Sequence, residues 1–319
     1  MKLAILDDYQ NVALASADWA RLKGVDITVF REPFASLEEA AKKLAPFEIL
    51  CLMRERMALP RALIERLPKL KFVSLTGYRA GTLDSEACKE RGIPVSHTRS
   101  GNGLQSTAEI TWGLIIAAAR GLAQAERNMR SGRWHDALAS GMALAGRRLG
   151  IIGLGKIGTC VARIGKAFGM QVSAWSQNLT PEKADAAGVA YQSKEDLLSL
   201  SDVVTIHLVL SERTRGLLGA KELALMKPTA ILVNVSRGPI VDEKALIGSL
   251  AKGRPGHAAL DVYDQEPLPA EHALRKLPNV TLSPHLGYVN EDNYRTFYAD
   301  TVENVAAWLQ GKPLRLLNP

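Results

Sequence analysis

The chain has 319 residues, of which 47% are hydrophobic and 23% are charged, and its formal net charge is +7. Length and composition fit an ordinary globular protein with room for two domains, each with its own core. The basic residues are scattered rather than grouped in a dense run, which argues against a nucleic-acid partner, and no apolar run is long enough to cross a membrane.

Cysteine usage and the start of the chain bear on cellular location and on metal binding. Cys51, Cys88 and Cys160 form neither a CxxC pair nor a zinc spacing, which suits a reducing compartment. Met1 and Lys2 lead directly into an apolar run, so we expect no signal peptide. The sequence therefore predicts a cytoplasmic protein with no metal site.

The first hundred residues alternate short apolar runs with helical stretches. The helical stretch that starts near Leu37 has Ser36 and Glu39 placed as a capping box. The apolar runs are predicted to be strands and cover residues 3–6, 26–30, 49–52, 72–75 and 94–96. Short strands that alternate with helices form parallel sheets, so we expect a small α/β domain here.

Two loops of this first part follow apolar strands and carry arginines. Arg54 lies in the first loop, and Gly77, Tyr78 and Arg79 lie in the second. Ligands bind at the carboxyl ends of strands in open α/β sheets, where glycine-flanked N–H groups can hold a carboxylate and an arginine adds charge. The alternative is that both are surface loops with solvated arginines, and the sequence leaves both interpretations open.

A hinge and a long helix come next. Two glycines and an asparagine within residues 100–103 break any regular structure. Ser106 and Glu109 are then placed to cap a helix that continues to about Met129. A helix so rich in small residues is more often core than interface, and a dimer surface is the second interpretation.

The stretch from residue 148 to residue 158 predicts a dinucleotide site. A short apolar run ends in Gly153-x-Gly155-x-x-Gly158, and an amphipathic helical pattern follows at once. The first glycine allows the turn, the second lets the backbone approach a pyrophosphate, and the third lets helix and strand pack closely. The helix N-terminus then offers unpaired N–H groups to an anion. A glycine-rich loop without a ligand is the alternative.

The next strand, residues 171–175, bears on the choice of cofactor. In a unit selective for NAD, an acidic residue at the end of this strand bonds the ribose hydroxyls. Here the position is Ser176, so the charge that would repel a 2′-phosphate is missing, and no arginine follows to bind one. The choice between NAD and NADP stays open. Further strands are predicted at residues 203–207, 230–234, 257–261 and 279–283, which gives a six-stranded sheet.

Three polar side chains follow strand ends in this second part, namely Arg237, Glu266 and His285. Reduction of a 2-oxo acid needs a cation, a carboxylate and an imidazole. Arg237 would hold the carboxylate and carbonyl oxygens, His285 would exchange the hydroxyl proton, and Glu266 would orient His285. Each residue alone is more often structural. Together, after the glycine motif, they favour catalysis.

The order and spacing of these motifs resemble those of the D-isomer-specific 2-hydroxyacid dehydrogenases. The resemblance covers nearly the whole chain and rests on residues 153–158, 201–207, 234–238, 266–267 and 283–287. It implies that Arg237, Glu266 and His285 are catalytic. It also implies that the loop of Tyr78 and its neighbours grips the substrate carboxylate. The chain departs from the family pattern at Ser176, where many members have Asp, and at Tyr78-Arg79, where many have a small residue followed by Gly.

The resemblance further implies an α/β fold of two domains, with a doubly wound Rossmann sheet inserted into a smaller flavodoxin-like α/β substrate domain. Residues 100–287 would form the dinucleotide-binding domain, and residues 1–99 with 288–319 would form the substrate domain. Family members are commonly dimers, with the helix near residues 107–130 in the contact, so we expect a homodimer.

Cofactor contacts are expected from the glycine loop and from the strand ends that follow it. In chain order the residues expected to bind NAD or NADP are Gly153, Leu154, Gly155, Lys156, Ile157, Gly158, Ser176, His207, Thr214, Val235, Ser236 and Asp261. The residues expected to bind substrate are Arg54, Gly77, Tyr78, Arg79, Arg237 and His285.

The expected activity is hydride transfer between NAD or NADP and a small 2-hydroxy acid or 2-oxo acid, with D-specificity implied by the resemblance. Reduction of the 2-oxo acid is the expected working direction. The alternative on the same fold is a cofactor-sensing scaffold that binds partner proteins, as transcriptional corepressors resembling this family do.

Overall fold

The computed structural model describes residues 1–78 and 81–318. The chain divides into two compact units, which are described separately below. Unit 1 comprises Met1–Asn102 and Val289–Pro319, and unit 2 comprises Gly103–Tyr288. Each unit is built on a parallel sheet, which confirms the predicted α/β class.

The sheet of unit 1 has five parallel strands in the order β2-β1-β3-β4-β5. This is the flavodoxin-like order, so that part of the prediction is confirmed. The central strands β3 and β4 are buried along their whole length, as expected for strands covered on both faces. The bounds are β1 Lys2–Ile5, β2 Asp26–Val29, β3 Ile49–Leu52, β4 Phe72–Leu75 and β5 Val95–His97.

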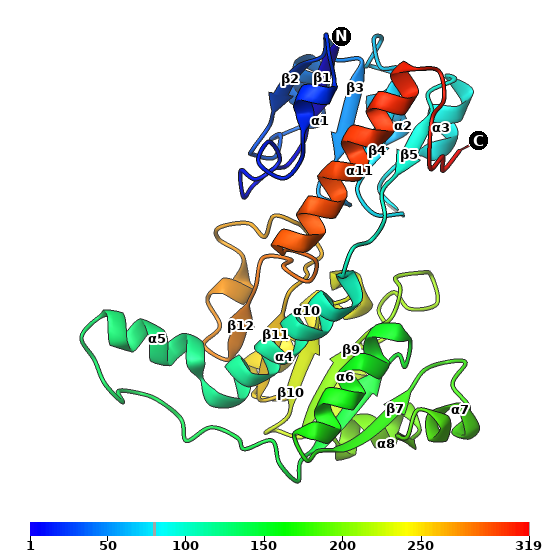
Figure 1. Ribbon diagram of the computed structural model, residues 1–319. Coiled ribbons are helices and arrows are strands. Elements are labelled where there is room, and N and C mark those ends of the chain that lie inside the picture. Colours follow the sequence, from blue (N-terminus) through cyan, green and yellow to red (C-terminus); the bar gives the residue numbers. More distant parts are fainter. Residues whose placement is uncertain (79–80, 319) are drawn as a thin grey trace. The chain divides into compact units, whose positions relative to one another are not determined.

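Helices cover the sheet of unit 1. Ser36 caps the first of them, since its Oγ accepts the N–H of Glu39 at 3.1 Å. The C-terminal helix α11 packs against β4 and β5 (Figure 1), although its Asp300 is 201 residues from its partner Arg99, which follows β5. The bounds are α1 Leu37–Leu44, α2 Arg61–Ile64, α3 Ser85–Glu90, α11 Glu291–Leu309 and the 3-10 turn η1 Trp19–Arg21.

The sheet of unit 2 has seven parallel strands in the order β12-β11-β10-β9-β6-β7-β8. From β8 inward this is the doubly wound Rossmann order, with β6 and β9 at the point where the winding reverses. The predicted count of six was wrong, because the edge strand β8 is only two residues long and leaves no hydrophobic pattern. The bounds are β6 Arg148–Ile152, β7 Gln171–Trp175, β8 Ala190–Tyr191, β9 Val203–Ile206, β10 Ile231–Asn234, β11 His257–Leu260 and β12 Val280–Leu282.

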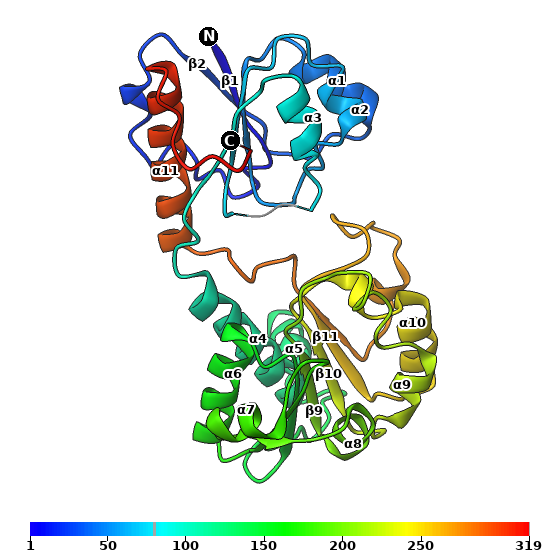
Figure 2. The same cartoon turned by 90° about the vertical axis from the view of Figure 1, so that its right-hand side faces the viewer.

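Helices cover both faces of this second sheet, and each face has its own apolar cluster. Figure 2 shows α4 and α6 on one face and α9 and α10 on the other. The bounds are α4 Gly103–Arg120, α5 Leu122–Arg130, α6 Lys156–Ala167, α7 Pro181–Ala186, α8 Lys194–Leu200, α9 Ala220–Leu225, α10 Glu243–Ala251 and the 3-10 turns η2 Gly238–Ile240 and η3 Ala273–Arg275.

The long helix differs from its prediction at both ends. It begins at Gly103, so Ser106 lies inside α4 and does not cap it; the Ser106 hydroxyl instead donates to the Gly287 carbonyl at 2.9 Å. It ends at Arg120, because Gly121 adopts a left-handed conformation with φ +62° and starts a separate helix, α5.

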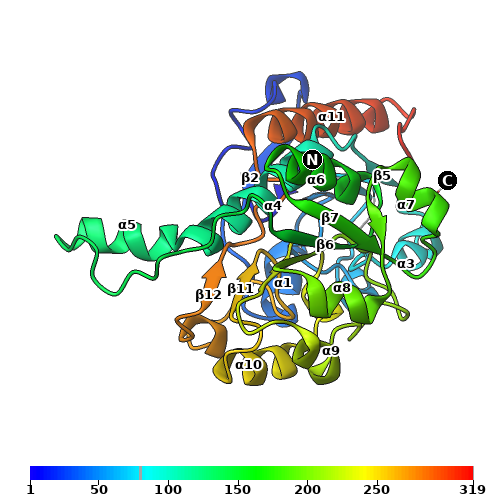
Figure 3. The ribbon, with the colours of Figure 1, turned by 90° about the horizontal axis from the view of Figure 1, so that it is seen from below.

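Helix α5 and the loop after it extend away from the rest of unit 2 (Figure 3). This segment carries three exposed large apolar side chains, Leu122, Met129 and Trp134, of which Trp134 is 68% exposed. None of the helices in the described residues is both long enough and apolar enough to cross a membrane.

Candidate active site

The glycine loop between β6 and α6 is shaped by close backbone contacts. Gly153 has φ +102°, and a Cβ there would lie 2.5 Å from the carbonyl oxygen of His207. A Cβ on Gly158 would collide with the carbonyl oxygen of Gly153. Around Gly155 the space is open, since a Cβ there would have no neighbour within 4 Å. Two glycines therefore close the turn, and the middle one leaves room beside the backbone.

The N-terminus of α6 has the features of a phosphate site. Its N-cap is Gly155, which provides no side-chain cap, and its first turn holds no acidic residue. The first N–H groups of a helix have no partner within the helix and carry the positive end of its dipole. A dinucleotide pyrophosphate would satisfy them, so the residues present fit that group.

Three polar residues expected to bind the cofactor follow β9 and β10, and the first of them, His207, adjoins Gly153 of this loop. The His207 residue is half-buried, and its Nδ1 is buried without a hydrogen-bond partner in the described part of the chain, while its Nε2 lies 3.0 Å from Thr205 Oγ1. Burial lowers the pKa of His207 to about 3, so its ring is neutral. The hydroxyls of Ser236 and Thr214, both expected to bind cofactor, are used within the protein. The Ser236 hydroxyl donates to the carbonyl of Ile206 at the end of β9, and the Thr214 hydroxyl donates to the carbonyl of Val209 in its own loop.

The end of β7 lies beside a loop that carries an arginine, a neighbour that the sequence analysis did not predict. Ser176 is half-buried, and the next side chain, Gln177, donates from Nε2 to the carbonyl oxygen of Arg213 at 3.1 Å. The loop of Arg213 therefore lies beside the strand end that faces the ribose in Rossmann units. The Arg213 side chain itself is exposed.

His285 and Glu266 form a close pair. His285 Nδ1 lies 2.5 Å from Glu266 Oε2, and the two side chains are 25% and 33% exposed. The other carboxylate oxygen, Oε1, accepts the backbone N–H of Tyr263 at 2.9 Å. The ring of Tyr288 meets the imidazole edge-on, with centroids 5.6 Å apart. Glu266 is thus fixed at one oxygen and orients the imidazole with the other.

Arg237 follows β10 in the segment next to this pair. Its Nη1 donates to the carbonyl of Ser236 at 2.6 Å, and its own carbonyl accepts from Asn234 Nδ2 at 2.9 Å. The backbone of Gly238 packs so closely on Tyr263 that a Cβ would collide with the Tyr263 carbonyl. Because β10, β11 and β12 are neighbours in the sheet, the structure brings the segments of all three predicted catalytic residues together at its carboxyl edge.

His285 has an unusual backbone conformation that its neighbours maintain. Its φ is +54°, which costs about 1–2 kcal/mol for a residue with a side chain. Asp261 accepts the N–H groups of the next two residues, Leu286 and Gly287, at 2.8 Å each. Asp261 is fully buried, and burial raises its pKa despite these bonds. Asp261 was expected to bind cofactor, and in this structure both its oxygens hold the backbone after His285.

The predicted substrate loops in unit 1 meet each other. The N–H of Arg54 donates to Thr76 Oγ1 at 2.8 Å, and the Arg54 guanidinium lies so close to Gly77 that a Cβ there would collide with it. The N–H of Gly77 donates to Thr98 Oγ1 at 2.8 Å, so this N–H already has an acceptor within unit 1. Tyr78 is 55% exposed, and Arg79 lies outside the described residues.

Sequence reasoning missed Tyr263 and Asn234, which hold these segments from within the sheet edge. Both lie in the segments that carry Arg237 and Glu266, where the charged residues are the more conspicuous candidates. The signal that could have found them is their position, since each stands at a strand end beside a predicted catalytic group. Among the described residues, no group of three His, Cys, Asp or Glu is arranged to hold a metal ion.

Comparison with known proteins agrees with this geometry. The sequence profile of the D-isomer specific 2-hydroxyacid dehydrogenase NAD binding domain matches residues 112–287. The glyoxylate reductase of Aeropyrum pernix is 40% identical over 290 residues, which are 86% of each chain. The D-3-phosphoglycerate dehydrogenase of Methanocaldococcus jannaschii is 36% identical over 86% of this chain, which spans about half of that relative, 52%.

Solved structures give the same result over the full length. The phosphoglycerate oxidoreductase of Vibrio cholerae O395 superposes with a TM-score of 0.91 at 37% identity, covering 98% of this chain and 99% of that one. The D-lactate dehydrogenase of Escherichia coli gives 0.83 at 25% identity, covering 99% and 100%. These relatives are oxidoreductases and lend no support to the scaffold alternative. The chain is therefore an oxidoreductase that uses a nicotinamide cofactor and belongs to the D-isomer specific 2-hydroxyacid dehydrogenase family.

Proposed function

We propose that this enzyme works as a 2-oxo acid reductase, with His285, Glu266 and Arg237 as its catalytic residues. The observation that carries the proposal is the 2.5 Å contact between His285 Nδ1 and Glu266 Oε2. A bound nicotinamide supplies the hydride, and the protein supplies position and proton. Because Glu266 engages Nδ1, Nε2 is the nitrogen that gives its proton to the carbonyl oxygen of the substrate.

Arg237 binds the anionic end of the substrate in this proposal. A guanidinium is planar and always charged, so it can bond a carboxylate and the adjacent carbonyl oxygen together. The bond from Arg237 Nη1 to the Ser236 carbonyl limits how the group can turn. Negative charge that develops on the carbonyl oxygen during reduction is then stabilised by a cation already in place.

In unit 1 the proposed substrate residues are Arg54 and the loop of Gly77, Tyr78 and Arg79. The contact of the Arg54 guanidinium with Gly77 supports a shared role for the two loops. Arg54→Ala should raise KM more than it lowers kcat, because it removes binding rather than proton transfer. An unchanged KM would exclude Arg54 from substrate binding.

We propose glyoxylate or a similarly small 2-oxo acid as substrate. Support comes from the glyoxylate reductase of A. pernix, which matches this chain over 86% of its own length. A panel of glyoxylate, hydroxypyruvate, pyruvate, phenylpyruvate, 2-ketogluconate and the 3-phosphoglycerate pair, with NADH and NADPH, tests the class. Absence of turnover with every acid, in protein that binds cofactor, would overturn it.

Two substitutions test the residue roles. His285→Asn should lower kcat on the order of 100-fold or more, since general acid catalysis contributes that much. Arg237→Ala should lower kcat/KM by a comparable factor, because Arg237 binds the substrate carboxylate and stabilises the transition state. Cofactor binding, followed by quenching of protein fluorescence, should persist in both variants. A variant that keeps the wild-type rate would remove that residue from the mechanism.

For the cofactor, we propose that the enzyme accepts NADPH as well as NADH. Ser176 carries no charge to repel a 2′-phosphate, and the loop of Arg213 is bonded to Gln177 beside it. Arg213→Ala should weaken binding of 2′,5′-ADP, measured by calorimetry, and leave ADP binding unchanged. Arg215→Ala, two residues away, is the matched control. Equal effects on both nucleotides would contradict a role for Arg213.

We further propose a homodimer that uses the α5 segment. Its exposed apolar residues Leu122, Met129 and Trp134 would be covered by a second copy of the chain. Sedimentation of wild type and of Trp134→Glu tests this, and a wild-type monomer would contradict it. A cytoplasmic location is proposed because the three cysteines are free thiols, and cell fractionation tests it.

A further inference from the structure

The turn after β11 contacts the segments of all three proposed catalytic residues, and one residue of that turn, Tyr263, makes each contact. Its backbone N–H donates to Glu266 Oε1 at 2.9 Å. Its carbonyl packs against Gly238, the residue that follows Arg237. Its hydroxyl lies 2.9 Å from the carbonyl oxygen of Ser283, two residues before His285.

The Tyr263 hydroxyl joins the ends of two neighbouring strands. Besides the Ser283 carbonyl it lies 3.1 Å from the carbonyl of Leu260, so its one proton is shared between the last residues of β11 and the segment after β12. The side chain is 7% exposed. Burial raises the pKa of the phenol, so the group stays a protonated donor at every working pH.

His285 is consequently held on both sides by the same turn. Before it, the Ser283 carbonyl is bonded by the Tyr263 hydroxyl. After it, the N–H groups of Leu286 and Gly287 are bonded by Asp261. A residue with φ +54° keeps that conformation only where its surroundings fix it.

We propose that Tyr263 is a positioning residue of the His285–Glu266 pair, with its hydroxyl setting the backbone from which the imidazole projects toward the carboxylate. The inference rests on the proposed acid–base role of His285. It assigns Tyr263 no contact with substrate or cofactor.

A second side-chain hydrogen bond between β11 and β12 provides a matched control. His257 Nε2 lies 2.9 Å from Thr281 Oγ1, which joins the first residue of β11 to the middle residue of β12. Thr281→Val removes one buried hydrogen bond between these strands, as Tyr263→Phe does. If the Tyr263 hydroxyl only stabilised the sheet, the two variants would behave alike.

The experiment compares Tyr263→Phe, Thr281→Val and His285→Asn with wild type, by pH profiles of kcat/KM and by cofactor affinity. Reduction needs a protonated imidazole, and a looser contact with Glu266 makes that proton easier to lose. Tyr263→Phe should therefore move the alkaline midpoint about half a pH unit lower. It should lower kcat on the order of tenfold, less than the roughly 100-fold cost of a 1 Å misplacement.

Cofactor affinity should stay within about twofold of wild type in Tyr263→Phe, because the change acts on the proton donor. Thr281→Val should keep the wild-type midpoint and kcat. A Tyr263→Phe profile that coincides with that of Thr281→Val would overturn the inference. His285→Asn distinguishes failure of the proposed function from failure of the inference about Tyr263. If His285→Asn retains the wild-type rate, the proposed function fails. If His285→Asn is inactive and Tyr263→Phe behaves as wild type, only the role of Tyr263 fails.

Discussion

Two adjacent carboxylates, Asp7 and Asp8, show how differently one residue type can behave at neighbouring positions. Both are almost fully buried after β1. Asp8 accepts the N–H groups of Val12 and Ala13 at 3.0 Å each, so both its oxygens are bonded. Asp7 Oδ2 is buried and, among the described residues, bonds to nothing. Burial raises the pKa of Asp7 from 3.8 to about 6, against the opposing effects of Arg56 and Tyr9.

This raised pKa gives a stability prediction with a definite sign. The folded state holds the Asp7 proton more tightly than the unfolded state, so the resulting stability is fully present below pH 3.8 and is lost as pH rises through about 6. Asp7→Asn should raise the free energy of unfolding at pH 8 by about 1–2 kcal/mol. It should also flatten the pH dependence relative to wild type between about pH 4 and 6. Urea unfolding at several pH values measures both effects.

Asp8→Asn is the control for that experiment. An amide has one oxygen, so one of the two backbone N–H groups would lose its acceptor and meet a second donor. The free energy of unfolding should fall by about 1–3 kcal/mol at pH 8. Destabilisation by both substitutions to the same extent would show that the unbonded oxygen of Asp7 has no energetic consequence.

In the turn between β6 and α6, two glycines are needed for different reasons. Gly158 needs its missing side chain for packing, because a Cβ would collide with the backbone of Gly153. Gly158→Ala should therefore lower the free energy of unfolding by about 1–3 kcal/mol. Gly155 has extended backbone angles and open space, so Gly155→Ala should fold with nearly the wild-type Tm.

The same pair of variants should separate in cofactor binding. A methyl group at Gly155 would occupy the space where the backbone approaches the pyrophosphate, so Gly155→Ala should weaken NADH binding at least tenfold, by an estimate on the order of 1.4 kcal/mol. Fluorescence titration of the folded variant measures this. Wild-type affinity in Gly155→Ala would mean that the pyrophosphate does not approach at this glycine.

An element can be predicted from the sequence when the contacts that form it are local in the chain. The turn at Gly153, the cap at Ser36 and the apolar strands come from local sequence, and the sequence predicted them. The start of α4 at Gly103 was missed because Ser106, a good N-cap by local rules, bonds the distant Gly287 carbonyl instead. The contact of Tyr263 with Ser283 likewise depends on which strands are neighbours, and local sequence carries no signal for it.

In the candidate site, the charged residues could be predicted from the sequence, but the residues that hold them in place could not. Arg237, Glu266 and His285 stand at strand ends, where a parallel sheet gathers functional groups. That Asp261 would use both oxygens on the backbone after His285 could not be read from the sequence, since it depends on the left-handed conformation of His285. The hydrogen bond between Gln177 and the Arg213 loop likewise connects segments that are far apart in the sequence, so local sequence does not predict it.

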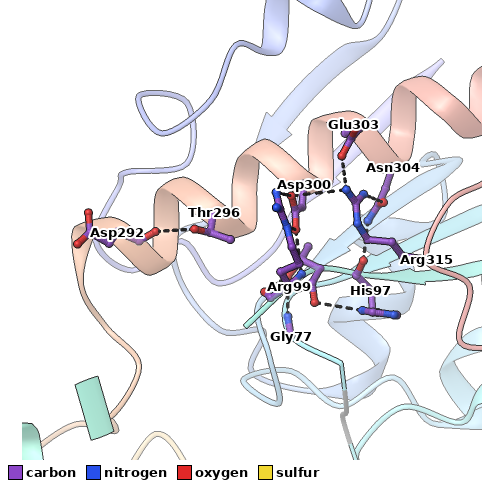
Figure 4. Close-up of polar contacts among 10 residues, drawn as sticks. Gly77, His97, Arg99, Asp292, Thr296, Asp300, Glu303, Asn304 and Arg315 are labelled. Carbon is purple, nitrogen blue, oxygen red and sulfur yellow. Dashed lines mark hydrogen bonds and ion pairs between the residues drawn. The ribbon is translucent and has the colours of Figure 1, made fainter. Parts of the chain in front are cut away.

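Across the molecule, unit 1 is assembled from two distant parts of the chain. Asp300 of α11 is buried and accepts the backbone N–H of Arg99 at 2.8 Å, its Nε at 3.0 Å and its Nη2 at 2.6 Å. Asn304 donates to the carbonyl of His97 at 2.9 Å, and Arg315 donates to Asn304 at 2.6 Å (Figure 4). The sheet edge at β5 therefore depends on a helix formed by residues far along the chain.

Asp300→Asn should loosen unit 1 and leave unit 2 intact. Burial opposes the charge of Asp300, but its bonds from Arg99 outweigh burial and lower its pKa. Its stabilisation is therefore present at neutral pH and is lost as pH falls through the folded-state pKa, which lies below 3.8. In hydrogen exchange at pH 7, the free energy of opening of β5 and α11 should be about 1.5–3 kcal/mol lower than in wild type. Protection of β6 and β7 should not change.

Glu291→Gln serves as the matched control, because this carboxylate lies on the same helix but is 85% exposed in its pair with Arg295. Exposed ion pairs contribute little, so its exchange pattern should match wild type. Equal loss of protection in both units of Asp300→Asn would mean that the units unfold as one, and no loss in α11 would mean that other contacts hold the helix. Confinement of the effect to unit 1 follows from the contacts themselves, since every bond of Asp300 described here stays within that unit.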